Sequence, residues 1–325
     1  MSVAGSSTAR PGIARIPITI RGIQIALGLI WLLDGALQFQ AFMYSHAFLA
    51  EAIEPTARMQ PGWAGQPILW ASDLVGKDLA LWNTLFALVQ CAIGLGLLYR
   101  RTVKPALILS FAWALVVWWF GEGFGMVLMN MGSPFAGSPG AVVLYAVVGV
   151  LVWPGAQDGG RSAAGAGALG DRGGLVAWSA AWLCSAALWV AVLARPVYSI
   201  SGSLVEASGD SMPWLGGLQR SLATALSGEG KPIAALLLVL SLAIAAGVWS
   251  RRRRETLLLG ALVSLVYWTL GQSLGGLTTG SATDPNIGPL FLLLAVALWP
   301  AGVRSAPARR RLSPRSGRGV LQPLP

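Results

Sequence analysis

Eight long apolar runs with few charges divide this sequence, and they constrain its fold more than any other feature. A helix that crosses the hydrocarbon core of a bilayer needs roughly 20 mostly apolar residues, which is close to the length of most of these runs. The chain is therefore predicted to be an all-α integral membrane protein with about eight transmembrane helices. The predicted spans are residues 18–42, 81–99, 105–120, 140–153, 175–193, 232–249, 256–270 and 287–299.

The composition supports a membrane location. Hydrophobic residues make up 55% of the 325-residue chain, charged residues make up 11%, and the mean hydropathy is +0.64. A soluble protein of this composition would have too little polar surface to stay dispersed. The net charge of +10 is carried by short basic clusters between the apolar runs and at the two ends of the chain, not by a basic face interleaved with aromatic residues. The lipid bilayer is thus the expected partner, and nucleic acid is not.

The distribution of Lys and Arg predicts the orientation in the membrane. If the N-terminus faces the cytoplasm and eight helices follow, 18 of the 23 basic residues fall in cytoplasmic segments. An excess of positive charge on the cytoplasmic side is typical of inner-membrane proteins. The sequence therefore predicts a multi-pass protein of the bacterial inner membrane with both termini in the cytoplasm. The basic residues on the outer side would be Arg58, Lys77, Arg195, Arg220 and Lys231.

Composition also divides the chain into segments. Residues 1–16 form a polar tail, and 302–325 form a basic tail rich in Pro and Arg that is predicted to be disordered. Two membrane units are predicted, over 17–154 and 175–301. Between them, 155–174 is rich in Gly, Ala and Ser, which predicts a flexible cytoplasmic linker that buries no core.

Several sequence landmarks occur twice in the same order. Residues 117–125, Val-Trp-Trp-Phe-Gly-Glu-Gly-Phe-Gly, resemble residues 267–275, Tyr-Trp-Thr-Leu-Gly-Gln-Ser-Leu-Gly. A Gly-Ser pair follows each segment, and the last predicted helix of each half ends in Trp-Pro. This order of landmarks predicts two tandem four-helix units. Because four is an even number of spans, the two units would have the same orientation, as parallel repeats.

Ionisable residues inside a membrane are costly, so two carboxylates are candidates for function. Asp34 lies late in the first predicted span, and helical spacing places it on one face with Trp31 and Gln38. Glu122 lies among glycines at the outer end of the third span. If the polar faces point into the bundle, these groups would meet near the outer leaflet. The alternative is that both carboxylates simply reach lipid headgroups or water.

Two amides extend this candidate site for binding or proton handling. Asn83 and Gln90 are seven residues apart in the second predicted span and share a helical face. The second half has Gln272 where the first has Glu122, and it has no acid that matches Asp34. Any charged site is therefore predicted to lie in the first half.

A second candidate site would bind a metal. Met126, Met129 and Met131 crowd the segment after Glu122, while the single histidine, His46, follows the first span. Thioether and imidazole ligands suit Cu(I), so copper is a candidate cofactor. The alternative is that the methionines fill gaps at a helix end. No Cys-rich or paired-His spacing supports the metal hypothesis further.

Two outer connections, 43–80 and 196–231, are long for links between helices. They contain Trp63, Trp70 and Trp214, and amphipathic stretches such as 69–75, which predict interfacial helices over the bundle. A binding surface is expected on this side. Signatures of common enzyme classes are absent from the sequence: it has no Walker loop, no dinucleotide fingerprint and no nucleophile elbow.

The first predicted span contains residues 28–35, Gly-Leu-Ile-Trp-Leu-Leu-Asp-Gly. A four-helix unit that contains this segment resembles the DoxX and MauE-like group of small bacterial membrane proteins. In this chain the unit would be present twice. The resemblance implies an association with quinone-linked thiosulfate oxidation or with redox maturation of periplasmic proteins, and it makes a quinone a candidate cofactor. No catalytic residue of the group is carried over to this chain.

Three functions stay open from the sequence. The first is a redox-associated membrane component that binds quinone or handles electrons and protons through Asp34 and Glu122. The second is a transporter or exporter of a small solute or metal ion, although the spans lack the paired interruptions often found at transporter sites. The third is a structural or assembly subunit with a membrane or extracytoplasmic protein partner. Whether the chain is an enzyme is not settled by these patterns.

Overall fold

The computed structural model describes residues 18–58, 60–155, 162–195 and 198–300, and the regular elements of this part of the chain are all helical, with no β-strand. The predicted tails 1–16 and 302–325 lie outside the described residues. The α-helices are α1 (Ile20–Leu37), α2 (Glu54–Arg58), α3 (Gly62–Gly76), α4 (Leu79–Leu98), α5 (Val103–Val116), α6 (Ala141–Leu151), α7 (Gly170–Ala194), α8 (Ile200–Gly209), α9 (Pro213–Ala225), α10 (Gly230–Gly247), α11 (Arg253–Val266) and α12 (Ile287–Ala297).

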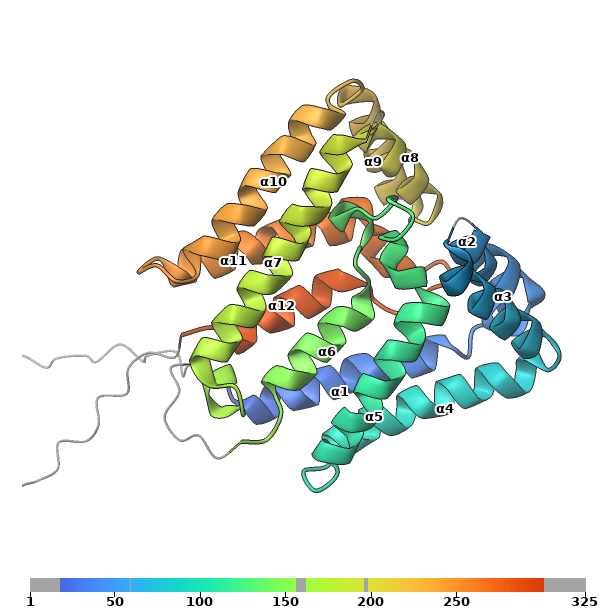
Figure 1. The fold of residues 1–325 in the computed structure, drawn as a ribbon, viewed down its shortest axis with the longest axis horizontal. Helices are drawn as coiled ribbons and strands as arrows, with labels where there is room; N and C mark the ends of the chain where they lie inside the picture. The colour runs from blue at the N-terminus through green and yellow to red at the C-terminus, as the bar shows by residue number, and fades with distance from the viewer. Residues whose placement is uncertain (1–17, 59, 156–161, 196–197, 301–325) are drawn as a thin grey trace, which may run out of the picture.

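In the first half, α1 packs along α4, which is followed by α5 and then α6 (Figure 1). Small residues allow α1 and α4 to approach closely. A Cβ on Gly28 would lie 2.9 Å from the Gly94 carbonyl oxygen, and one on Gly35 would lie 2.6 Å from the Cys91 Sγ. Such small residues let the backbones of membrane helices pack by van der Waals contact, where no hydrophobic effect drives them together.

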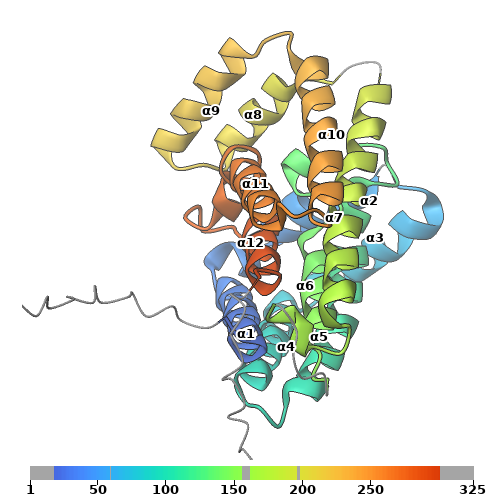
Figure 2. The same ribbon diagram turned by 90° about the vertical axis from the view of Figure 1, so that its left-hand side faces the viewer.

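In the second half, α7 packs along α10, and α11 packs against both α10 and α12. The two halves meet in the middle of the molecule, where α6 contacts α12 (Figure 2). Across this centre α1 contacts α12, and α6 contacts α7. A single core of buried apolar residues therefore runs through both halves.

The long connections are helical, as the sequence predicts. In the first, α2 and α3 pack together, and in the second α8 packs against α9 (Figure 1). Trp63, Trp70 and Trp214 are each more than 60% exposed on these helices. Exposed indoles on amphipathic helices are typical of the interface between lipid and water.

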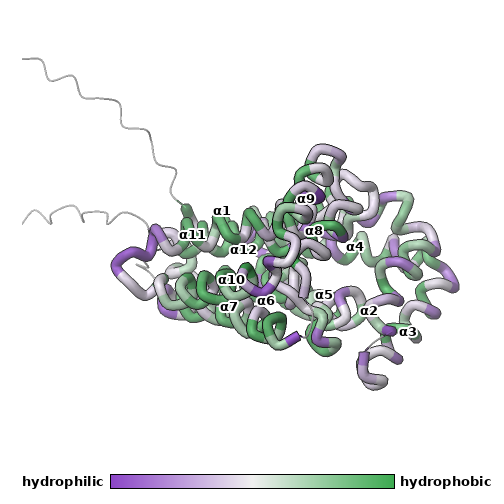
Figure 3. Tube along the Cα trace, turned by 90° about the horizontal axis from the view of Figure 1, so that it is seen from above, coloured by the Kyte–Doolittle hydropathy of each residue, from purple (hydrophilic) through white to green (hydrophobic). Residues whose placement is uncertain are grey.

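Five helical segments of the described chain are long and apolar enough to cross a membrane: Ile20–Leu37, Leu79–Leu98, Val103–Gly121, Gly170–Ala194 and Gly230–Gly247. Figure 3 shows mainly hydrophobic residues along α7 and α10. Apolar side chains also lie on the outside of the bundle. Leu95, Val239 and Leu262, for example, are each 58% to 60% exposed. These features indicate a membrane protein.

Two of the predicted spans form short helices. The α6 and α12 helices have 11 residues each, which corresponds to roughly 16 Å at 1.5 Å per residue. A bilayer core is about 30 Å thick, so neither helix crosses it alone. Both helices are nevertheless apolar and packed in the core.

Similar breaks follow the third and the seventh predicted spans. A π-helical turn, Val117–Gly121, ends the helix of α5, and a tight turn follows at Gly123–Met126. After α11 the same order occurs, with a π-helical turn at Tyr267–Gly271 and a tight turn at Ser273–Gly276. The chain then re-enters the bundle as α6 or α12. Hydrophobicity alone marks these segments as apolar, whereas the backbone breaks at residues that adopt positive φ angles, such as Phe124.

An indole holds each interruption in place. The Trp118 Nε1–H donates a hydrogen bond of 2.8 Å to the Pro139 carbonyl, and the Trp268 Nε1–H donates one of 2.7 Å to the Pro285 carbonyl. Both prolines lie just before the short helices. Broken backbone is tolerated at membrane depth where such partners satisfy its polar groups.

Part of the segment predicted to be a flexible linker is folded. Of residues 155–174, those from 162 onward are folded, and α7 begins at Gly170, before the predicted start of its span. Ala163 and Ala164 are at most 5% exposed, within the core. The small side chains that suggested flexibility instead allow close packing: a Cβ on Gly167 would lie 2.1 Å from the Leu151 carbonyl oxygen.

Candidate functional site

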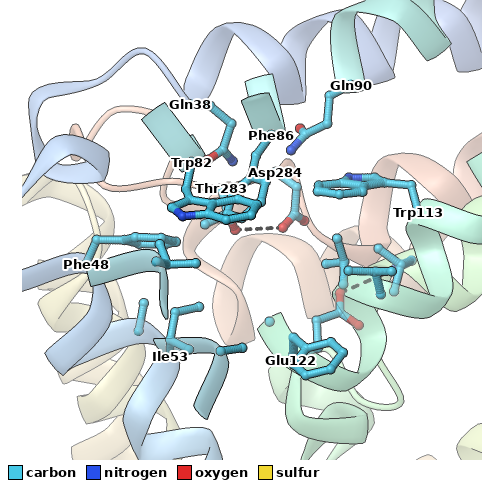
Figure 4. A pocket seen from close by; sticks show the side chains of 18 of the residues that line it. Gln38, Phe48, Ile53, Trp82, Phe86, Gln90, Trp113, Glu122, Thr283 and Asp284 are labelled. Carbon is cyan, nitrogen blue, oxygen red and sulfur yellow. Dashed lines mark hydrogen bonds between the residues drawn. The ribbon is translucent and has the colours of Figure 1, made fainter. Parts of the chain in front are cut away.

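A cavity of about 410 Å³ lies in the first half, between α1, α4, the end of α5 and the helices of the first long connection (Figure 4). Its walls are mainly apolar, and eight of the lining residues are aromatic. The aromatic side chains are Trp31, Phe48, Trp70, Trp82, Phe86, Trp113, Phe120 and Tyr145. Large flat rings of this kind provide apolar stacking surfaces for a ligand.

Polar side chains from distant parts of the sequence line the same cavity. Of the five residues predicted from the sequence, Asp34, Gln38, Gln90 and Glu122 are brought together here. Asn83 is not part of the lining. Its side-chain amide donates a hydrogen bond of 2.7 Å to the Gln38 carbonyl oxygen, so it fastens the end of α1 to α4.

Asp34 is buried, with 3% of its surface exposed. The Tyr145 hydroxyl donates a hydrogen bond of 2.5 Å to Asp34 Oδ2, whereas Oδ1 has no hydrogen-bond partner in the described protein. The ring of Tyr145 also packs against Trp31, one turn before Asp34, with ring centroids 4.4 Å apart. The residue that shares a helical face with Asp34 thus positions the tyrosine that binds it.

Glu122 follows the π-helical turn and reaches into the cavity. Its Oε1 accepts a hydrogen bond of 3.3 Å from the Val142 backbone N–H, near the start of α6, while Oε2 has no partner in the described protein. Burial, together with the nearby Asp284, raises the pKa of Glu122 to about 8. At neutral pH this carboxyl is therefore mostly protonated.

A glycine makes room for Glu122. Gly140 has φ +119°, and a Cβ at this position would lie 1.9 Å from Glu122 Oε2. A side chain at residue 140 is thus excluded both by the backbone conformation and by the carboxyl group.

The second half contributes a third carboxyl, which the sequence analysis missed. Thr283 and Asp284 precede α12 and line the cavity beside the first-half residues (Figure 4). Asp284 Oδ1 accepts a hydrogen bond of 2.7 Å from the Asn286 N–H, and Oδ2 accepts one of 2.8 Å from the Thr283 hydroxyl. Burial raises the pKa of Asp284. The prediction that any charged site lies in the first half alone is therefore wrong, because Asp284 of the second half also lines the cavity.

The sequence contains only a weak indication that Asp284 belongs to the site. Asp284 lies outside the apolar runs, so it does not stand out as a charge within a predicted span. It stands one residue before Pro285, as Ser138 stands before Pro139 at the corresponding turn of the first half. The sequence alone does not show that this turn reaches the cavity of the other half.

The cavity is acidic without a basic counterpart. Three carboxyl groups line it, and the described lining contains no Lys, Arg or His. Such a group of carboxyls in apolar surroundings shares protons, because full ionisation would place several like charges close together.

The residues predicted to bind copper do not lie at this cavity. His46 is exposed, Met131 is 50% exposed, and Met126, Met129, Met131 and His46 are all absent from the lining. In the part of the chain that the structure describes, no group of three or more His, Cys, Asp or Glu side chains is placed to hold a metal ion.

A second, smaller cavity of about 200 Å³ lies between α6, α7 and α12. Its lining includes Trp182, Ser185, Tyr267 and Phe291, together with Ser138 from the first half. No carboxyl group of the described residues lines it.

Comparisons of this chain with protein-family models, curated proteins and solved structures find no match.

Proposed function

We propose that this chain is a redox-associated membrane component whose aromatic, carboxyl-lined cavity binds a lipid-soluble ligand of the quinone class and exchanges protons with it. The observation that carries this proposal is the convergence of Asp34, Glu122 and Asp284 on one cavity walled by aromatic rings. An apolar pocket with a few convergent polar groups is the usual form of a small-molecule site.

The groups in the cavity fit such a ligand. Aromatic walls stack on a flat ring, and the side-chain amides of Gln38 and Gln90 can donate hydrogen bonds to ring carbonyls. Asp34 Oδ1 and Glu122 Oε2, which have no partner in the described protein, can accept hydrogen bonds from ring hydroxyls. A bound quinone would supply the redox chemistry. The carboxyl groups of this chain would hold or take up the protons that accompany its reduction or oxidation.

The proposal includes the membrane topology. We infer eight segments at membrane depth in two parallel units, in the bacterial inner membrane with both termini in the cytoplasm. In this arrangement α6 and α12 reach the required depth only together with the interrupted segments before them. Support comes from the repeated interruptions and from the placement of α2, α3, α8 and α9 on one side of the molecule, away from the starts of α1 and α7 (Figure 1).

The test is quinone binding by the purified protein. Lipid extracts of the detergent-purified chain are analysed for quinone, and a short-tailed benzoquinone is titrated while tryptophan fluorescence is recorded, since four lining residues are indoles. We expect saturable quenching that weakens by about tenfold or more in Glu122→Gln and Asp34→Asn, as loss of a buried hydrogen bond predicts.

Asp73→Asn is the matched control, because Asp73 is exposed on α3 and does not line the cavity. Its quenching should equal that of the unchanged protein. Absence of both extracted quinone and saturable quenching in the unchanged protein would refute the proposal.

A second candidate function is export of a small solute. The paired interruptions after α5 and α11 favour it, because broken helices in corresponding positions of two repeats often form transporter sites. Uptake of candidate solutes into vesicles that contain the protein, driven by a proton gradient, tests this function. Quinone binding without flux would leave the first proposal in place.

A further inference from the structure

We propose that the smaller cavity, between α6, α7 and α12, is a second binding site, and that it takes a single uncharged ring that carries a hydrogen-bond acceptor such as a carbonyl oxygen. A quinone as the natural ligand rests on the proposed function. The site itself stands on contacts that do not involve the acids of the larger cavity.

The cavity has the size and the walls of a site for one ring. Its volume is about 200 Å³, and a cavity of about 150 Å³ lined by apolar side chains is large enough to hold benzene. Trp182, Tyr267 and Phe291 provide aromatic surface on its wall, and the ring centroids of Trp182 and Phe291 are 5.1 Å apart. A flat ligand would pack against these side chains without needing a charged group.

The hydroxyl groups of the wall are already engaged within the protein. The Ser138 hydroxyl donates a hydrogen bond of 2.7 Å to a backbone carbonyl. Ser185 Oγ lies 3.2 Å from Ser241 Oγ, and the Ser241 hydroxyl donates to a backbone carbonyl, so Ser185 is the donor of the pair. The Tyr267 hydroxyl oxygen accepts a hydrogen bond of 3.0 Å from the Trp189 Nε1–H. With these bonds in place, and with no Asp, Glu, Lys, Arg or His in the described lining, the wall favours an uncharged ligand.

The indole of Trp182 is the exception among these polar groups. Its Nε1–H has no hydrogen-bond partner in the described protein, although the residue is only 1% exposed. Trp31, in the wall of the larger cavity, has the same feature. The residue three positions after the indole is Asp34 in the larger cavity and Ser185 in the smaller one. Because a buried N–H without a partner is costly, an acceptor oxygen on the ligand would stabilise the complex at Trp182.

The cavity reaches the outside of the bundle along α7. Ala177, Ala180, Ala181 and Cys184 line it, and of these Ala180 is exposed while the other three are half-buried. This helix is long and apolar enough to cross a membrane. A lipid-soluble ligand would therefore reach the cavity from the hydrocarbon phase, past alanine side chains that leave it room.

The experiment is equilibrium dialysis of radiolabelled tetramethyl-1,4-benzoquinone against the detergent-purified chain. The methyl groups of this probe block its addition to the Cys184 thiol. We expect one molecule to bind in each cavity. Trp182→Phe keeps an aromatic ring but removes the N–H, so it should weaken binding in the smaller cavity by roughly fivefold. Ala181→Phe should abolish that binding by filling the cavity, whereas Glu122→Gln should affect only the molecule in the larger one.

A second probe tests the role of the acceptor. Tetramethylbenzene has a similar shape but no acceptor oxygen, so its competition for the smaller cavity should be equally strong in Trp182→Phe and in the unchanged protein. Leu183→Phe serves as the control, because Leu183 is exposed on α7 and does not line the cavity. If Ala181→Phe fails to fold, Ala177→Leu takes its place.

The outcomes separate this site from the proposed function. Binding that neither Trp182→Phe nor Ala181→Phe changes would overturn the second site, and it would leave the proposed function standing if Glu122→Gln still weakens it. Binding that depends on Trp182 and Ala181 but not on Glu122 would support the second site and contradict the proposed function. Absence of any bound probe would overturn both.

Discussion

The hydroxyl of Tyr145 donates a hydrogen bond of 2.5 Å to Asp34 Oδ2 and joins α6 to α1 inside the first half. In the second half, Phe291 packs against Trp182 without a hydroxyl group. The Tyr145 hydroxyl provides a hydrogen-bond donor to the buried Asp34 carboxyl.

We expect Tyr145→Phe to fold and to lose about 1–3 kcal/mol of stability, because one more oxygen of a buried carboxyl is left without a partner. Thermal unfolding in detergent measures the loss. Tyr99→Phe is the control, since Tyr99 is exposed and should tolerate the change. Equal melting temperatures for the two variants would show that the Tyr145–Asp34 hydrogen bond contributes little.

Gly140→Ala should destabilise the protein by about 1–3 kcal/mol, because φ +119° is strained for a residue with a Cβ. The contact with Glu122 Oε2 adds to this cost, so Glu122→Ala should relieve part of it in a double-mutant cycle. Gly217→Ala, on α9 where a Cβ meets no atom within 4 Å, is the control and should be neutral or slightly stabilising. Additive effects of the Gly140 and Glu122 changes would argue against the steric contact.

Glu122 predicts how stability depends on pH. Its pKa is raised from 4.5 to about 8 in the folded state, so the folded state binds more protons than the unfolded state between these values. This contribution is fully present below about pH 4.5 and is lost as the pH rises through about 8. Between pH 5 and pH 9 the melting temperature of the unchanged protein should fall by about 3 °C more than that of Glu122→Gln. Parallel curves for the two proteins would contradict the raised pKa.

Reporter fusions test the topology. Fusions after Tyr99 and after Trp249 place the reporter between α4 and α5 and between α10 and α11, where basic residues cluster. We expect both reporters to be in the cytoplasm. Either reporter on the outer side would refute the eight-segment arrangement.

The helices themselves were largely predictable, because long apolar runs allow few alternatives in a membrane. Each of the eight runs corresponds to a helix, and the long connections contain the expected helices. The ends of the third and seventh runs, at residues 120 and 270, were predicted, but the positive φ angles that Phe124 and Leu274 adopt just after them were not. Periodicity reports burial and does not report such a break.

The candidate site was predictable to the extent that it depends on helix faces. Asp34, Gln38 and Gln90 point into one cavity because their spacing along α1 and α4 fixes the direction of each side chain. Asn83 shares the helical face of Gln90, but its side-chain amide donates a hydrogen bond to the Gln38 carbonyl at the end of α1 and does not reach the cavity. Asp284 depends on how the two halves dock, and a pattern within one segment carries no information about that contact.

The short length of α6 and α12 has a consequence for how the protein is made. A segment of 11 residues, about 16 Å long, gains too little from lipid contact to enter a bilayer by itself. If these two helices lie at membrane depth, as proposed above, each would be inserted as a hairpin with the longer helix that precedes it. The indole bonds from Trp118 and Trp268 would close these hairpins at their turns. A nascent chain that stops before Pro139 would then lack the acceptor of the Trp118 hydrogen bond, which completes the first of these turns.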